Sequence, residues 1–504
     1  MSRAFSIGVR RPDRSPVCPR LRRARRSRGP ERADAARPTP RDGRATFFEF
    51  REGAQSGDRA GYCDVTHTPN EGPVVRPSRF TAALGLACAA SLGLGVTTTA
   101  TASSASAATG DFYTPPAAVP AQPGTLMKSE KFFTGLNMWG NTTRIMYSSK
   151  DDNGQPTAVT GAYIEPWAAW KGPGPRPVVV YGVGTIGQGD QCAPSRMMAS
   201  SINLSTPGSL GVNYETQGMN NLLAKGVAVV VTDYIGLGTP GRPHTYMNRD
   251  DQAHAMLDAA RVASKVPGAT VKANSKVATY GYSQGGGASA AAVEAAPTYA
   301  PDLDVAAAYV GAPPADLQKV LAGVDGSPIA GVIGYFINGA ASSSAAVKAF
   351  ADESVNATGK TMLSRTSGQC TVDTVVSYGY RKTSDFTATG EPIAAVMARN
   401  EEVTGFVRAQ RTGTMKPTAA VRVATGVADD VVPHAQSKQL ALDWCGKGAN
   451  VTYAPIPGLS LGPKSLLNHA NPMLADQLTA RDWVVQRLSG TPVTSNCSTA
   501  AGLK

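Results

Sequence analysis

The sequence predicts an α/β fold with a mainly parallel β-sheet covered by helices on both faces. Three β-branched runs, residues 177–181, 227–232 and 276–280, are continuously apolar, as expected of strands that are buried on both faces. Helix-like segments, for instance residues 250–264 and 288–296, separate the strands, and this alternation is typical of parallel sheets. With 42% hydrophobic and 17% charged residues, the chain can bury a core.

Further strands are predicted on both sides of these central runs. Two early strands separated by residues 151–154 (DDNG) indicate an antiparallel hairpin at one edge of the sheet. The further strands are predicted at residues 144–148, 158–166, 305–310, 420–425 and 451–455.

The alternation of strands and helices stops between residues 315 and 411. We therefore predict a largely helical insertion, 315–411, between two parts of one α/β core, 108–314 and 412–504. The apolar segment 320–339 within the insertion has two interpretations, a lining for an acyl chain and the ordinary core of the insertion.

Most of the positive charge lies at the start of the chain. The sequence has 49 Lys and Arg against 37 Asp and Glu, a net charge of +12, but residues 1–79 alone hold 18 Arg and 9 acidic residues. Residues 80–107 carry no charge, so the chain from residue 108 onward is nearly neutral. This distribution argues against a nucleic-acid partner for the body of the protein.

Residues 76–107 have the pattern of a secretory signal peptide. Arg76 and Arg79 precede the apolar run 81–96, which is too short to span a membrane, and small residues follow it. We expect cleavage near Ala107 and a secreted protein, with a retained membrane anchor as the weaker alternative.

Residues 1–75 precede this signal, although a signal peptide is expected at the beginning of a chain. They are rich in Arg, Pro and Ala and show no sustained hydrophobic period. We interpret them as a non-native or disordered extension that arises from a misassigned gene start. The alternative is a basic arm that binds nucleic acid.

Four cysteines remain in the body after the leader, and an even number in an exported protein suggests two disulfides. Four cysteines allow three pairings. No CxxC or HExxH motif occurs, so we expect no metal and no other cofactor. The four cysteines are Cys192, Cys370, Cys445 and Cys497.

The strongest motif is G-x-S-x-G at residues 281–285 (GYSQG), directly after the predicted strand 276–280. In a nucleophile elbow the serine lies on a strained turn between strand and helix, and glycines allow the two elements to approach closely. The small residues 285–292 fit that packing. We predict that Ser283 is a nucleophile; the alternative is a glycine-rich packing seam.

A serine nucleophile needs a base, and the base needs a carboxylate to orient it. In this architecture the order along the chain is serine, carboxylate, histidine. Asp429 and Asp430 follow a predicted strand, so they lie at a carboxyl end of the sheet. His434 is too close to them for a separate loop, so we predict His469 as the base. The alternatives are a surface role for His434 and a helix cap for Asp430.

Residues 182–187 (GVGTIG) match the dinucleotide pattern G-x-G-x-x-G. The next residues, 188–194 (QGDQCAP), break a helix start, and no acidic residue occurs in 200–213, so the dinucleotide interpretation is weak. We interpret the segment as an oxyanion loop. One donor should be the Gln284 N–H, and another the N–H of Thr185 or Ile186.

In combination, these residues resemble the secretory lipase family of α/β-hydrolases, to which fungal lipase A belongs. The likeness extends from about Tyr113 to Cys497 and rests on six segments. These are residues 144–166, 184–195 (GTIGQGDQCAPS), 233–238 (DYIGLG), GYSQGG, GVADDVVP and the C-terminal WCGKGANVTY.

The resemblance implies an α/β-hydrolase fold in which Ser283, Asp429 and His469 form the triad, with Asp429 rather than Asp430 as the acid. It also implies that 315–411 is a cap over the acyl site. Many bacterial members carry a His-Gly-Thr-Thr-Gly-like loop where this chain has residues 183–187 (VGTIG). The implied disulfides pair Cys192 with Cys370 and Cys445 with Cys497.

The expected function is that of a secreted carboxylic ester hydrolase of the triacylglycerol lipase type. We expect a monomer that acts on lipid or other esters and contacts a lipid interface transiently. The alternatives are a short-chain carboxylesterase, a serine peptidase on the same fold and, least favoured, a non-enzymatic binding protein.

Overall fold

The computed structural model describes residues 111–205 and 208–503. The predicted Arg-rich extension, the signal peptide and the cleavage near Ala107 lie outside the described residues. Within the described ranges, no helix combines the length and apolar character needed to cross a membrane.

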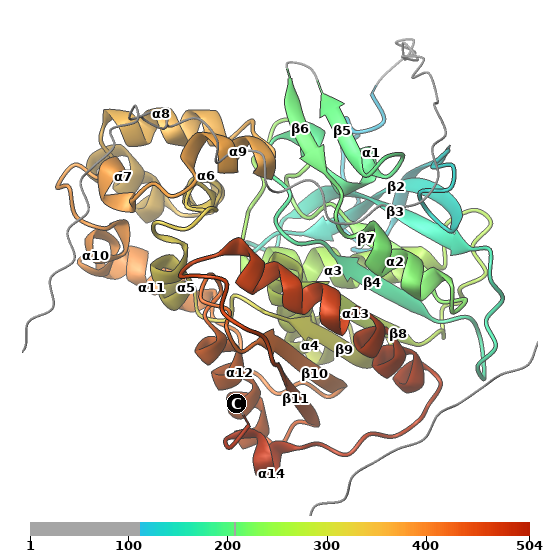
Figure 1. The fold of residues 1–504 in the computed structure, drawn as a ribbon. Helices are drawn as coiled ribbons and strands as arrows, with labels where there is room; N and C mark the ends of the chain where they lie inside the picture. The colour runs from blue at the N-terminus through green and yellow to red at the C-terminus, as the bar shows by residue number, and fades with distance from the viewer. Residues whose placement is uncertain (1–110, 206–207, 504) are drawn as a thin grey trace, which may run out of the picture. The chain divides into compact units, whose positions relative to one another are not determined.

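A nine-stranded sheet forms the centre of the protein, in the order β1-β2-β3-β7-β4-β8-β9-β10-β11 (Figure 1). From β7 to β11 neighbouring strands are parallel, whereas β1, β2, β3 and β7 pair antiparallel. This arrangement confirms the predicted α/β fold. The strands are β1 (Leu126–Phe132), β2 (Gly140–Lys150), β3 (Pro156–Pro166), β4 (Val178–Gly182), β7 (Ala228–Thr232), β8 (Val277–Tyr282), β9 (Val305–Gly311), β10 (Ala420–Gly426) and β11 (Val451–Ile456).

The hairpin predicted around residues 151–154 is present as β2 and β3, but its predicted place at the edge of the sheet is wrong. The edge strand is β1, which pairs with β2. Its sequence, LMKSEKF, is charged and partly exposed, a composition that protects an edge strand from pairing with other chains. The apolar runs used to predict strands do not reveal such a strand.

Helices cover both faces of the sheet (Figure 1). On one face, α3 (Arg249–Ala263) packs against α4 (Gln284–Tyr299), and on the other α13 (Leu466–Leu488) packs against α2 (Thr216–Leu223). The largest cluster of buried apolar residues lies between these layers and includes Val179, Val229 and Met256. Burial on both faces explains why the central strands are continuously apolar.

Between β9 and β10 the described chain forms seven α-helices, which gather beside the sheet (Figure 1). They have their own apolar cluster, which includes Tyr335, Ile337 and Phe386. The helices are α5 (Leu317–Val324), α6 (Val332–Ser343), α7 (Ala345–Ser354), α8 (Ala357–Thr366), α9 (Thr371–Tyr378), α10 (Ile393–Ala398) and α11 (Glu401–Ala409).

Candidate active site

Ser283 lies on a tight turn between β8 and α4. Its φ of 57° and ψ of −124° are unusual for a residue with a side chain. The turn requires glycine on both sides, because a Cβ at Gly281 would lie 2.2 Å from the Gly285 carbonyl oxygen. A Cβ at Gly285 would lie 1.9 Å from the carbonyl oxygen of Gly182 on β4. The geometry is that of a nucleophile elbow.

His469 and Asp429 form a buried pair beside this turn. Nδ1 of His469 is 2.7 Å from Oδ2 of Asp429. Because a carboxylate only accepts, Nδ1 donates to it, and in the neutral imidazole the lone pair is then on Nε2. Nε2 is buried and has no hydrogen-bond partner among the described residues. A histidine in this state can accept a proton.

Two contacts fix the pair in place. The hydroxyl of Tyr282, the residue before Ser283, donates to the His469 carbonyl at 2.8 Å. Oδ1 of Asp429 accepts from the backbone N–H groups of Val431 at 3.2 Å and Val432 at 3.0 Å. Asp429 follows β10, and His469 lies in the first turn of α13, so the sheet and the helix bring two distant segments together.

Asp430 has a different place from its neighbour. It accepts from the backbone N–H of Lys464 at 2.6 Å and from the side-chain amide of Asn468 at 3.2 Å. The prediction that it caps the following helix is wrong, because α12 (His434–Gly446) has no side-chain cap. Asp430 instead holds the loop that leads into His469.

His434 begins α12 and is partly exposed, so the alternative of a surface residue at a helix start holds in part. It is half-buried, and its ring nitrogens lie 3.1 Å from the Gly426 carbonyl and 2.9 Å from the Tyr453 hydroxyl. Burial lowers its pKa from the usual value. Both ring nitrogens of His434 are thus occupied by contacts with the sheet, and neither contacts Asp429 or Ser283.

The loop after β4 lies over the elbow. The amides of Thr185, Ile186 and Gln284 have no hydrogen-bond acceptor within the described ranges. Thr185 lines the same cavity as Ser283, whereas the side chain of Ile186 packs into a separate small cluster with Leu237. The first regular element after this loop is a 3-10 helix at Asp190–Cys192, so the loop does not open directly into the long helix of a dinucleotide site.

Ser283 lines a narrow cavity with a free volume of about 50 Å³. Its wall is mostly apolar and comes largely from α5, α6 and the segment between them, while Tyr335 and Ile337 of the same region are core residues. Four side chains of residues 320–339 line the cavity and also belong to the apolar cluster of the insertion, namely Val324, Val332, Ile333 and Phe336. The lining is Thr185, Tyr246, Met247, Ser283, Pro314, Leu317, Val320, Leu321, Val324, Ile329, Val332, Ile333, Phe336 and Val432.

The loop after β4 is bound to the helical insertion. Gly187 pairs with Cys370 in an isolated antiparallel bridge, and the Thr371 N–H donates to the Ile186 carbonyl at 2.9 Å. A disulfide between Cys192 and Cys370 closes the same junction, and a second joins Cys445 to Cys497. This is the pairing that the family resemblance implied.

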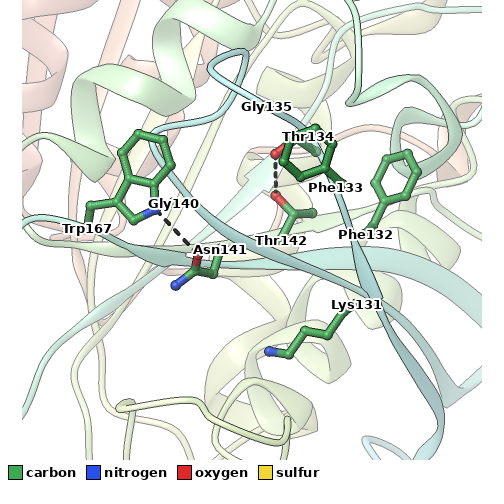
Figure 2. A pocket seen from close by; sticks show the side chains of 9 residues that line it. All are labelled: Lys131, Phe132, Phe133, Thr134, Gly135, Gly140, Asn141, Thr142 and Trp167. Atoms are coloured by element: carbon green, nitrogen blue, oxygen red, sulfur yellow. Dashed lines mark hydrogen bonds between the residues drawn. The ribbon is translucent and has the colours of Figure 1, made fainter.

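A second hollow lies where β2 begins and β3 ends (Figure 2). Trp167 and Asn141 line it, linked by a hydrogen bond of 3.4 Å from the indole N–H. Ile164 nearby pairs with Val229 at the beginning of β7, so this hollow lies toward the amino ends of the parallel strands, opposite Ser283. Across the described chain, no group of three or more His, Cys, Asp or Glu side chains could hold a metal ion.

Some contributors to the site carry no sequence signal that singles them out. Tyr246 and Met247 reach the cavity from a segment before α3, and the Tyr246 hydroxyl lies 2.7 Å from that of Thr185. His244 is fully buried, and its Nε2 lies 3.0 Å from the side-chain amide of Gln284. Burial lowers the pKa of His244 to about 4, so the ring is neutral and accepts this hydrogen bond.

The chain is similar to known lipases. A family model described as "Secretory lipase" matches residues 201–496. A "Probable inactive lipase" of Mycobacterium tuberculosis is 29% identical over 395 residues, covering 76% of this chain and 83% of the relative. A secreted triacylglycerol lipase of Malassezia restricta is 25% identical over 394 residues, covering 76% and 79%.

Solved structures share the fold. Candida antarctica lipase A in its closed state superposes with a TM-score of 0.66 at 20% identity, over 77% of this chain and 87% of that chain. The rice cell wall degrading esterase LipA from Xanthomonas oryzae superposes with a TM-score of 0.57 at 16% identity, over 73% of this chain and all of that chain (100%).

Proposed function

Because the chain belongs to the secretory lipase family of α/β-hydrolases, we propose that it is a secreted lipase that hydrolyses lipid esters through an acyl-enzyme. One observation carries the proposal. A buried histidine with a free Nε2, oriented by Asp429, contacts Tyr282, and the next residue is a serine that lines an apolar cavity. That combination suits an ester with an apolar acyl chain.

In the proposed reaction, Oγ of Ser283 attacks the ester carbonyl carbon and its proton passes to Nε2 of His469. Asp429 stabilises the imidazolium that forms. The negative charge on the carbonyl oxygen is stabilised by the N–H groups of Gln284 and Thr185. The tetrahedral intermediate collapses, and the alcohol leaves with the proton from Nε2. Water then attacks the acyl-enzyme by the same steps and releases the carboxylic acid.

The helical insertion, 315–411, is the proposed cap of this site, set between core parts 108–314 and 412–504. It supplies most of the apolar cavity wall, which supports an acyl-binding role. The secretory family and its secreted relatives support export, for which residues 76–107 would be the signal. We propose that the protein acts as a monomer and contacts a lipid interface transiently.

Direct assay tests this proposal, which matters because one relative bears the name of an inactive lipase. We expect hydrolysis of p-nitrophenyl esters across a C2–C18 series without cleavage of peptides, and covalent labelling by a fluorophosphonate probe. A preference for the shortest esters would indicate a carboxylesterase. Cleavage of peptides would indicate a serine peptidase. Folded protein that neither hydrolyses esters nor takes up the probe would be a binding protein.

Replacing Asp429 with asparagine should lower kcat about 10⁴-fold, because the amide no longer holds the correct tautomer of His469. The measurement is kcat for a short p-nitrophenyl ester. Asp430→Asn is the matched control, since Asp430 contacts Lys464 and Asn468 rather than the His469 ring, and its kcat should fall far less. Equal losses in the two variants would contradict the assignment of Asp429.

Removing the Cys192–Cys370 disulfide by serine at both positions should lower the free energy of unfolding by about 2–5 kcal/mol. It should also lower kcat, because the bond joins the loop carrying Thr185 to the cap. Serine at Cys445 and Cys497 is the comparison variant, because that bond lies away from the loop after β4. The segment that it closes contains His469, so we expect a smaller loss of kcat than in the first double variant. Thermal unfolding and kcat of both double variants distinguish the two effects.

A further inference from the structure

Glu215 is a buried carboxyl group beneath the loop after β4, and the proposed reaction does not use it. It directly precedes α2 but does not cap that helix with its side chain. Oε1 accepts from the Gly184 N–H at 2.9 Å, and Oε2 accepts from the Tyr181 hydroxyl at 2.7 Å. Its exposed fraction is 2%.

This position is costly for a carboxyl group. Burial raises the pKa of Glu215 to about 7, and within the described ranges no Lys, Arg or His forms an ion pair with it. An apolar side chain of similar volume would avoid the cost of removing a carboxyl group from water. Glu215 thus holds the Gly184 N–H and the Tyr181 hydroxyl at the cost of burying a carboxyl group.

The loop geometry indicates what these hydrogen bonds do. Glu215 accepts from the Gly184 N–H, which belongs to the peptide group that joins Val183 to Gly184. The Thr185 carbonyl belongs to the peptide group after Thr185, and it accepts from the hydroxyls of Tyr214 at 3.1 Å and Thr371 at 3.0 Å. Between these two fixed groups lies the peptide that carries the Thr185 N–H.

The packing beside Gly184 is close as well. A Cβ at this position would lie 2.4 Å from the Tyr214 hydroxyl and 3.3 Å from Oε1 of Glu215. The two residues that bind the loop are neighbours in sequence, so one short segment holds both flanking peptide groups. Because both flanking peptide groups are held, the Cα atoms at the two ends of the central peptide are held as well, which limits how far its N–H can move.

We propose that Glu215 is a positioning residue that holds the Thr185 N–H in the oxyanion hole. The inference rests on the proposed ester hydrolysis, in which this N–H stabilises the developing charge. The donor stabilises the charge of the transition state and not the bound ester. Misplacing it should therefore lower kcat and leave KM nearly unchanged.

Three variants at Glu215 test this. Glu215→Met fills a similar volume without an acceptor, and Glu215→Gln keeps an acceptor for Gly184 and a polar group for Tyr181. Glu215→Asp keeps the carboxyl group on a shorter side chain, and serves if the methionine variant does not fold. We expect kcat to fall about 100-fold in Glu215→Met with KM changed by less than about 2-fold. Glu215→Gln should remain within a few-fold of wild type, and Glu215→Asp should lie between them.

Glu294 provides a control. It too is a fully buried glutamate that accepts from a backbone N–H, that of Gly413 at 2.8 Å, and from an aromatic side chain, Trp444, at 2.7 Å. Unlike Glu215, it also forms an ion pair with Arg249 at 3.1 Å. Glu294→Met should therefore lose stability and keep its kcat in the folded fraction. If Glu215→Met and Glu294→Met have the same kcat, the proposal is overturned.

Hydrogen exchange separates this inference from the proposed function. Amide exchange in a peptide covering residues 183–187 should be at least about 10-fold faster in Glu215→Met than in wild type, and unchanged in Glu215→Gln. A wild-type protein without esterase activity would refute the proposed function, while faster exchange would still show that Glu215 fixes the loop. Unchanged exchange in Glu215→Met would overturn the positioning role whatever the activity.

Discussion

Replacing Ser283 with alanine should lower kcat for ester hydrolysis about 10⁶-fold, a loss of about 8 kcal/mol of transition-state stabilisation. The side chain projects from a turn held by the backbone and by Gly281 and Gly285. Removing its oxygen breaks no side-chain hydrogen bond within the described ranges, so the melting temperature should remain close to that of wild type. Ester hydrolysis, fluorophosphonate labelling and thermal unfolding of the same preparation measure both effects.

Ser289 on α4 is the matched control. Its hydroxyl is fully buried and lies 2.7 Å from that of Thr279 on β8. Ser289→Ala should lower the free energy of unfolding by about 1 kcal/mol and leave kcat and labelling near the wild-type values. If Ser283→Ala retained labelling, or if Ser289→Ala abolished it, Ser283 would not be the nucleophile.

The fold was predictable because its central strands carry an unambiguous signal. Strands β4 and β7 are buried on both faces, and their sequences are continuously apolar. Strand β1 was missed because charged residues at an edge follow no such pattern, and the short pair β5 (Ile202–Ser205) and β6 (Ser209–Val212) was missed as well. Local pattern thus reveals a strand only where burial dictates its composition.

The sequence predicted the candidate site only where a local motif or the chain order singles out a residue. The elbow at Ser283 has a local motif, and the chain order selected His469, whose hydrogen bond to Asp429 the structure contains. Neighbouring aspartates look alike in sequence, so spacing alone left Asp429 and Asp430 open, and tertiary contacts distinguish them. Glu215 contacts Gly184, 31 positions earlier in the chain, and no motif links the two.

Replacing His469 with alanine should lower kcat about as far as Ser283→Ala, about 10⁶-fold, because the hydroxyl of Ser283 has no other base. This variant should also be less stable, since Asp429 stays buried and loses a partner, at a cost of about 1–3 kcal/mol. His434→Gln is the control, because His434 contacts Gly426 and Tyr453 instead, and its kcat should stay within a few-fold of wild type.

The double variant of Ser283 and His469 tests whether the two residues act as a unit. If His469 serves only to move the proton of Ser283, its removal should cost nothing once the serine hydroxyl is gone. We therefore expect the double variant to have the same residual kcat as either single variant, from the oxyanion hole and substrate binding alone. A further loss of 10-fold or more in the double variant would mean that His469 contributes separately from Ser283, and the proposed triad would have to be revised.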